Sequence, residues 1–237
     1  MPSEITKSNA WASAILDVFD IYLPVDKNLT ILEIGGAPGG FLAYMSKNYG
    51  YQISALDYSM IGCALLKENF KLLNLNGRVF HKDLFNDDLS KIPKFNIVYS
   101  LGFIEHFLNL KNVIGKHLEL LKEEGFLLIG TPNFLGMNHY FKKLMSPIAL
   151  NKHNLSSMDI ENWVSFEKKY NLKIIFKGYI GGYRPSYNFE NINIFKLLLF
   201  GIFQVLNFFT DRIKFLRRIN SKKWSFYVIG IYRYDKQ

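Results

Sequence analysis

Cysteine is the scarcest chemistry-bearing residue in this sequence, with Cys63 the single one among 237 residues. One thiol cannot form an internal disulfide, and it cannot supply a thiolate metal cluster. Cys63 lies in a helical pattern between Ile61 and Leu65, which favours a packed thiol over a nucleophile.

Targeting signals are also lacking at the start of the chain. The segment from Met1 to Ala10 is polar and contains neither the apolar run of a signal peptide nor the pattern of a transit peptide. We therefore expect a cytoplasmic protein. The most apolar stretch, Ile192 to Phe209, is interrupted by Lys196 and other polar residues, whereas a membrane span needs about 20 apolar residues.

Positive charge is abundant and unevenly distributed. The net charge is +9, but residues 1–130 hold 12 Lys and Arg against 14 Asp and Glu, while residues 131–237 hold 17 against 6. The second half therefore carries the whole excess. We expect it to face something anionic, namely a phosphorylated substrate, a lipid surface or RNA, although a solvated basic face would give the same count.

The first 133 residues alternate between short apolar runs and helical patterns. Strands are predicted at 29–34, 52–56, 78–82, 96–100 and 126–129, and helices at 40–48, 60–73 and 111–122, the last ended by Gly125. This alternation predicts a doubly wound α/β fold with a mostly parallel sheet. We expect a single domain over 1–237 that begins with an N-terminal helix and has two halves, 1–133 and 134–237.

The pattern changes after Pro132. A helix is predicted at 158–170 and strands at 173–180 and 224–234, which can form an antiparallel hairpin at the sheet edge. Between these strands, Ile192 to Leu216 has apolar residues every three to four positions and predicts a helical insertion.

The segment "LEIGGAPGGF", Leu32 to Phe41, joins the first predicted strand to a helix. A dinucleotide fingerprint would be G-x-G-x-x-G, and here Gly35, Ala37 and Gly40 occupy the glycine positions. The Ala37 side chain would intrude on a pyrophosphate, and Pro38 removes one amide donor. The residues therefore argue against a dinucleotide.

The acid before this turn, in Glu33-Ile34-Gly35, resembles motif I of class I S-adenosylmethionine-dependent methyltransferases. Asp57 in "ISALDYS" and Asp83-Leu84 in "VFHKDLF" match the acids that follow the second and third strands in that family. The resemblance covers about Thr30 to Asn133 and implies a Rossmann-like, seven-stranded fold that uses S-adenosylmethionine and releases S-adenosylhomocysteine. It places the cofactor-binding half in 1–133 and the acceptor-binding half in 134–237. The cofactor-binding residues that it implies are Glu33, Gly35, Gly36, Ala37, Gly39, Asp57, Tyr58, Asp83, Leu84, Ser100 and Leu101.

Two later segments distinguish subgroups of this superfamily. "GGAPGGF" also resembles the turn of RNA ribose methyltransferases, but the catalytic Lys-Asp-Lys-Glu tetrad of that family is missing. "NIVYSLGFIEHF" and "LKEEGFLLIGTPN" are similar instead to the ubiquinone-pathway O-methyltransferases and to sugar and natural-product methyltransferases. The ubiquinone-pathway enzymes carry the motif Glu-x-x-Glu-His. Here Gly102 takes the place of its first Glu, so only Glu105 and His106 remain as candidate metal ligands. We predict no catalytic metal, because two ligands make a poor site.

Three histidines are candidate bases for taking a proton from an acceptor hydroxyl. His106 is the first candidate because it follows the fourth strand, and its alternatives are to cap the next helix or to close over the cofactor. His139, with its neighbour Tyr140, and His153 lie where this superfamily usually builds its acceptor pocket, and structural roles are their alternatives. Trp11 would belong to a lid or to an ordinary amphipathic helix.

The predicted function is methyl transfer to a small polar acceptor, through an oxygen of a sugar, nucleotide-linked or phosphate-bearing metabolite. The alternatives are a lipid-linked or quinone acceptor at the inner face of the membrane, an RNA methyltransferase and a non-catalytic binding protein; no nucleic-acid partner is expected. The 192–223 region predicts an interfacial helix on anionic lipid, a cover for the acceptor pocket or a homodimer contact. Its basic flank comprises Arg212, Lys214, Arg217, Arg218, Lys222 and Lys223.

Overall fold

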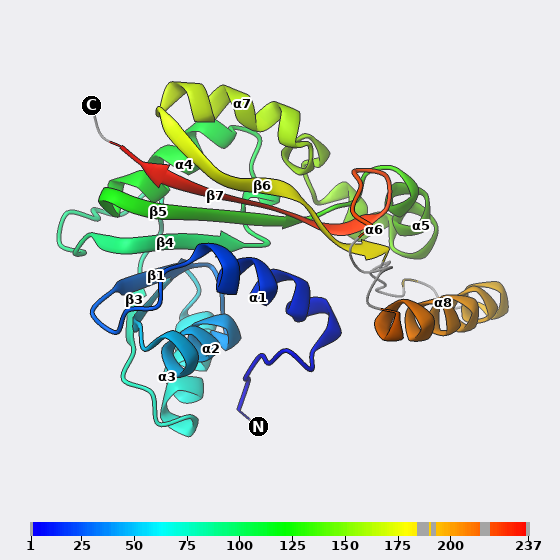
Figure 1. Cartoon of the computed structure of the whole chain (residues 1–237), viewed down its shortest axis with the longest axis horizontal. Coiled ribbons are helices and arrows are strands. Elements are labelled where there is room, and N and C mark those ends of the chain that lie inside the picture. The colour runs from blue at the N-terminus through cyan, green and yellow to red at the C-terminus, as the bar shows by residue number, and fades with distance from the viewer. Residues whose placement is uncertain (1, 184–189, 191–192, 214–218, 236–237) are drawn as a thin grey trace.

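A computed structural model describes residues 2–183, 190, 193–213 and 219–235, and contains one seven-stranded sheet (Figure 1). Its strand order is β3-β2-β1-β4-β5-β7-β6, which confirms the predicted mostly parallel, doubly wound fold. The strands are β1 (Thr30–Ile34), β2 (Gln52–Asp57), β3 (Arg78–His81), β4 (Phe95–Leu101), β5 (Leu121–Pro132), β6 (Leu172–Tyr183) and β7 (Ser225–Tyr234).

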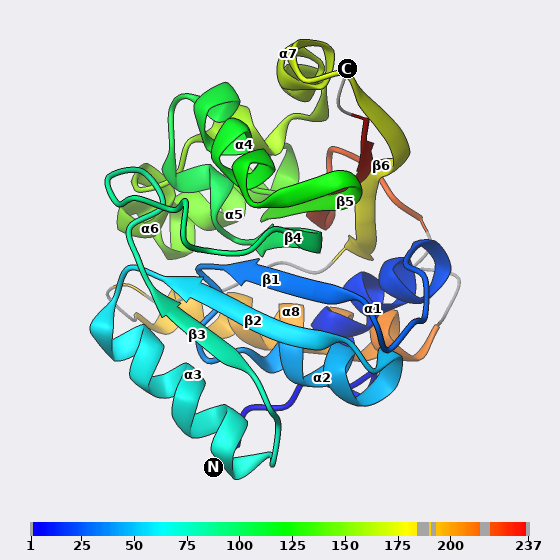
Figure 2. The ribbon, with the colours of Figure 1, turned by 90° about the vertical axis from the view of Figure 1, so that its left-hand side faces the viewer.

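Helices cover both faces of the sheet and bury two apolar layers (Figure 2). Successive strand side chains point to opposite faces, so Ile31 packs in one layer while Leu32 and Ile34 pack in the other. One face holds α1 (Ala10–Tyr22), α2 (Gly40–Tyr49) and α3 (Met60–Leu72). The other holds α4 (Leu110–Glu119) and α7 (Ile160–Lys169).

The parallel strands end at one edge of the sheet. In the register of the central strands, Glu33 of β1 lies opposite Ala55 of β2 and Tyr99 of β4. The residues that follow these strands therefore meet in one crevice, where doubly wound folds bind their ligands.

The predicted end of the fourth helix was wrong. The helix ends at Glu119 and β5 begins at Leu121, so Gly125 lies inside a strand. β5 bends there: Glu124 has a φ of 54°, and the pairing with β4 shifts between Phe95 and Ile97. A Cβ at Gly125 would lie 2.7 Å from the Leu121 side chain, so this glycine serves a strand irregularity and not a helix terminus.

The late strands form the predicted antiparallel hairpin. β7 pairs antiparallel with both β5 and β6, which leaves β6 at the edge of the sheet. Two helices, α5 (Met137–Met145) and α6 (Pro147–Asn151), follow β5, and the predicted insertion forms α8 (Ile194–Arg212). Among the described residues, no helix combines the length and apolar character needed to span a membrane.

Candidate active site

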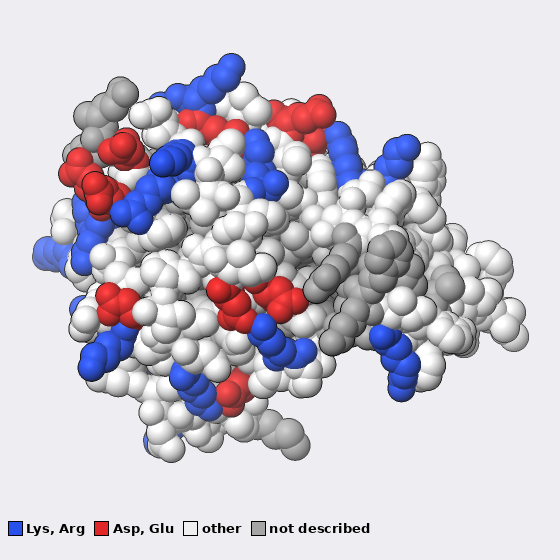
Figure 3. Space-filling view, in the orientation of Figure 1, with Lys and Arg blue, Asp and Glu red and all other residues white. Residues whose placement is uncertain are grey.

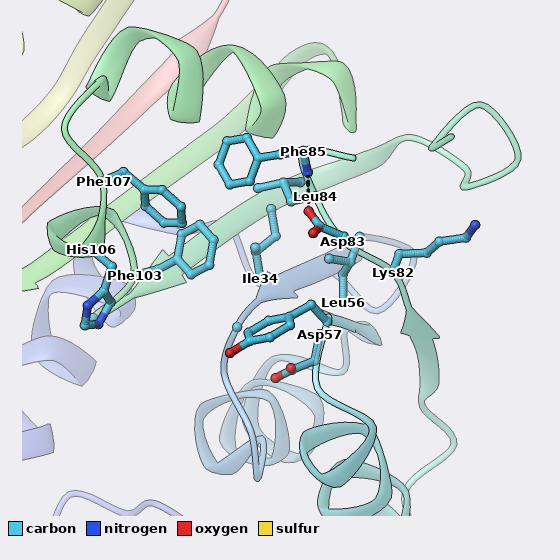
Figure 4. Close-up of a pocket in the computed structure, with 13 residues that line it drawn as sticks. Ile34, Leu56, Asp57, Lys82, Asp83, Leu84, Phe85, Phe103, His106 and Phe107 are labelled. Atoms are coloured by element: carbon cyan, nitrogen blue, oxygen red, sulfur yellow. Dashed lines mark hydrogen bonds between the residues drawn. The ribbon is translucent and has the colours of Figure 1, made fainter. Parts of the chain in front are cut away.

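A first cavity of about 550 Å³ opens at the ends of β1, β2, β3 and β4 (Figure 4). It brings together residues that the sequence places more than 70 positions apart. Its lining comprises Ile34, Gly35, Leu56, Asp57, Tyr58, Lys82, Asp83, Leu84, Phe85, Gly102, Phe103, His106 and Phe107.

Asp57 is the last residue of β2 and is only 8% exposed. Its Oδ1 accepts a hydrogen bond from the Ser59 backbone N–H at 2.8 Å, at the start of α3. Packing against α3 is close, because a Cβ at Gly62 would lie 2.8 Å from the Asp57 carboxyl carbon. The carboxylate is thus held at the cavity wall, where it can accept hydrogen bonds from paired hydroxyls.

Asp83 organises the loop after β3. Its oxygens accept hydrogen bonds from the Phe85 N–H at 2.8 Å and from Asn86 Nδ2 at 2.9 Å. The bond from the Asn86 side chain and the bond from the Phe85 backbone lower the pKa of Asp83, which keeps the carboxylate ionised. The adjacent Leu84 is buried, whereas Tyr58 is 74% exposed at the cavity rim.

Three phenylalanines form an aromatic wall that the sequence analysis missed. The ring of Phe107 lies 4.9 Å from the rings of both Phe85 and Phe103, measured between centroids. These residues come from loops after β3 and β4, and nothing in the sequence separates them from ordinary core phenylalanines. They give the cavity an apolar surface on which a planar ring can stack.

The turn between β1 and α2 needs glycine at defined positions. Gly35 and Gly39 have φ values of 70° and 84°. Gly36 has another constraint: a Cβ there would lie 1.9 Å from the Glu33 carboxyl carbon. The turn therefore folds over the Glu33 side chain.

A second cavity of about 630 Å³ shares Gly35 and Gly102 with the first. The two spaces therefore adjoin at the glycine turn and at the end of β4. The segment from Pro2 to Ile5, which sequence reasoning missed, closes one side. The remaining lining consists of Asn9, Trp11, Ile15, Glu33, Gly36, Ala37, Pro38, Gly40, Phe41, Leu101, Glu105, Pro132 and Tyr227.

Of the three acids that line the second cavity, Glu4, Glu33 and Glu105, the last two are almost fully buried. Glu33 is 3% exposed and Glu105 is 2% exposed. Burial raises the pKa of Glu33 to about 8 and the pKa of Glu105 to about 7. Among the described residues, Oε2 of each carboxyl has no hydrogen-bond partner. A buried carboxylate is costly without a partner, so both acids suit a positively charged ligand in this cavity.

The predicted base His106 lies in the short turn η1 (Ile104–His106) and lines the first cavity. Its ring lies 5.0 Å from the ring of His153, whose Nδ1 is 2.5 Å from the Ala149 carbonyl oxygen. Burial and the neighbouring His153 lower the pKa of His106, which favours a neutral imidazole able to accept a proton.

The remaining predicted residues lie apart from these groups. His139 is on α5 with its ring 5.9 Å from Tyr140, and neither residue lines either cavity. Ser100 is fully buried, and its Oγ is 3.0 Å from His117 Nε2. Gly39 shapes the turn but is not part of either lining.

Within the part of the chain that the structure describes, one group of side chains could hold a metal ion. Glu105, His106 and His153 each offer a ligand atom, and these atoms lie within 4.8 Å of one another. His153 supplies the third donor that the sequence analysis did not count. The predicted absence of a catalytic metal stays a prediction, which metal analysis of the purified protein would test.

The family model described as "Methyltransferase domain" matches residues 6–176. No curated protein matches the chain.

Solved structures resemble the chain in fold at low sequence identity. PH0226 protein from Pyrococcus horikoshii OT3 has a TM-score of 0.62 and 14% identity, over 98% of this chain and 92% of that chain. Geranyl diphosphate C-methyltransferase from Streptomyces coelicolor, solved with S-adenosyl-L-homocysteine, has a TM-score of 0.60 and 12% identity, over 92% of this chain and 74% of that chain. Coclaurine N-methyltransferase bound to N-methylheliamine and S-adenosylhomocysteine has a TM-score of 0.58 and 12% identity, over 92% of this chain and 71% of that chain. Because the family model spans more than half of the chain, the protein belongs to the methyltransferase domain family.

Proposed function

We propose that this S-adenosylmethionine-dependent methyltransferase transfers the methyl group to a hydroxyl oxygen of a small polar acceptor. The observation that carries the proposal is the junction of the two cavities. Asp57 lines the first, and the buried acids Glu33 and Glu105 line the second. A donor with hydroxyls at one end and positive charges at the other fits this arrangement.

Each group of residues has a task in that reaction. Asp57 would bind the ribose hydroxyls, and the phenylalanine wall would pack on the adenine. Glu33 and Glu105 would neutralise positive charge and change from protonated to ionised as they do so. Bound S-adenosylmethionine supplies an electrophilic methyl group, so the protein chiefly aligns the acceptor oxygen and excludes water.

The choice of oxygen rests on His106 and not on the structural neighbours, which include a C-methyltransferase and an N-methyltransferase. A hydroxyl acceptor must lose a proton, and a neutral imidazole at the cavity rim can take it. The described lining of the second cavity contains no Lys or Arg. An anionic group of the acceptor, such as a phosphate, would therefore lie outside this cavity, towards the basic second half.

Activity on a panel of acceptors tests the proposal. We expect S-adenosylhomocysteine release with members of a panel of neutral sugars, phosphorylated sugars, nucleotides and phenols. His106→Ala should lower kcat by about 10²-fold or more, with the dissociation constant for S-adenosylhomocysteine little changed. Activity confined to amines, or an unaltered kcat in His106→Ala, would contradict the oxygen assignment.

A lipid-linked or quinone acceptor at the membrane is the second candidate. The observation that favours it is helix α8, which leaves large apolar side chains exposed beside the helices that follow β5. An assay that offers a long-chain catechol in mixed micelles, in parallel with the water-soluble panel, distinguishes the two candidate functions. Turnover of the catechol alone would favour the second candidate.

A further inference from the structure

Helix α8 exposes more apolar surface than soluble helices normally leave in water. Eight of its large apolar side chains are half exposed or more. They are Ile194 (79%), Phe195 (59%), Leu197 (50%), Leu198 (66%), Ile202 (58%), Val205 (57%), Phe208 (50%) and Phe209 (52%).

Among the described residues, the buried side chains of this helix lie along one stripe. Phe203 is 4% exposed and its ring packs edge-on against Phe141 of α5, with 4.5 Å between centroids. Asn207, four residues further on, is also buried. The other sides of α8 face away from the sheet, and Figure 1 and Figure 3 show the helix projecting beyond the body.

The sequence around the helix is mainly basic, although Lys214, Arg217 and Arg218 lie outside the described residues. The segment 192–223 contains seven Lys and Arg residues and a single acid, Asp211. Arg212 is exposed at the end of α8, and Lys223 is exposed in the segment that leads to β7.

The exposed apolar side chains and the basic residues together indicate which partner could cover the apolar sides of α8. A second copy of the chain would bring two basic segments together, which repels. An anionic bilayer complements both features, because apolar side chains enter the acyl region while Lys and Arg meet the headgroups. No described helix can span a bilayer, so α8 would lie in its surface.

We propose that α8 docks this protein onto anionic membranes, with its exposed apolar side chains inserted at the headgroup boundary. The helix packs on α5, which follows the carboxyl end of β5, and Pro132 of β5 lines the second cavity. Docking therefore sets the end of the sheet that carries the cavities near the lipid. It does not depend on which acceptor is methylated.

Vesicle flotation tests this proposal directly. Full-length protein is mixed with phosphatidylcholine vesicles with or without phosphatidylglycerol, and we expect it to float only with the anionic vesicles and less at high salt. Leu198→Glu with Ile202→Glu should weaken binding by about tenfold or more, because both side chains enter the lipid. The matched control is Ile21→Glu with Val25→Glu, which changes the charge equally at side chains 70% and 68% exposed.

Both double variants should keep the wild-type affinity for S-adenosylhomocysteine, which shows that they fold. Four results would overturn the proposal: no flotation of wild type, equal binding to neutral and anionic vesicles, unchanged binding of the α8 variant, or equal loss in the control. A concentration-dependent dimer that the α8 substitutions abolish, without flotation, would identify a second copy as the partner instead.

Discussion

Asp57 is the residue that most directly tests the donor site. Removing its carboxylate by Asp57→Ala should weaken S-adenosylhomocysteine binding by about 1.5 to 3 kcal/mol, the range for hydrogen bonds to a charged group. The affinity of Asp57→Asn for S-adenosylhomocysteine should lie between those of the wild type and Asp57→Ala, because the amide oxygen still accepts a hydrogen bond. Isothermal titration measures the affinities. Asp88→Ala, which removes an exposed carboxylate outside both linings, is the control. Equal affinity for Asp57→Ala and wild type would show that Asp57 does not hold the ligand.

At the residue scale, the positions of the acids near strand ends could be predicted from the sequence, but the burial of individual side chains could not. Glu33, Asp57 and Asp83 were expected at the crevice from their match to the methyltransferase motifs, and in the structure Glu33 lies near the end of β1, Asp57 ends β2 and Asp83 follows β3. Glu105 was considered only as a metal ligand, since its near-complete burial comes from tertiary packing. The meeting of His106 with His153 likewise depends on loops 47 positions apart, which Asn154 holds together by donating from its backbone to the Glu105 carbonyl and from its side chain to the Phe107 carbonyl.

At the element scale, the turn between β1 and α2 depends on the absence of one side chain. Gly36→Ala places a Cβ 1.9 Å from the Glu33 carboxyl carbon, so the buried acid must move. We expect the free energy of unfolding to fall by about 1 to 3 kcal/mol and ligand binding to be lost. Urea denaturation measures the first effect and titration the second.

A double-mutant cycle tests whether the contact between Gly36 and Glu33 causes the loss of stability in Gly36→Ala. Glu33→Ala combined with Gly36→Ala should recover part of the stability lost in Gly36→Ala, because the clash is removed. Gly201→Ala is the comparison, since nothing lies within 4 Å of a Cβ there, and it should stabilise α8 by about 0.5 to 1 kcal/mol. A fully additive cycle would rule out the contact as the reason.

Elements with a clear periodicity were predictable, and those decided by local geometry were not. The insertion over Ile192–Leu216 was expected as a helix and forms α8 over Ile194–Arg212. Gly125 was misplaced because a glycine after a helical pattern predicts a helix end. Here the glycine relieves crowding against Leu121 and the Lys122 carbonyl at the bent start of β5.

At the scale of the whole molecule, Glu33 couples folding, ligand binding and pH. Its ordinary pKa of 4.5 rises to about 8 through burial. A carboxyl group with a raised pKa contributes stability that is fully present below pH 4.5 and is lost as the pH rises through about 8. The melting temperature of the ligand-free protein should therefore fall over this window more steeply than that of Glu33→Gln.

Ligand binding should reverse this effect, because a cationic ligand favours the ionised form of Glu33. We expect S-adenosylhomocysteine, through its ammonium group, to bind with release of close to one proton near neutral pH and to bind more tightly as the pH rises. Calorimetry in two buffers of different ionisation enthalpy measures that proton. Glu33→Gln should remove most of this release, whereas Glu119→Gln, at a carboxylate paired with Lys116 outside both linings, should preserve it. Proton release that persists in Glu33→Gln would assign the effect to another group, and proton uptake by wild type would mean that no cation meets Glu33.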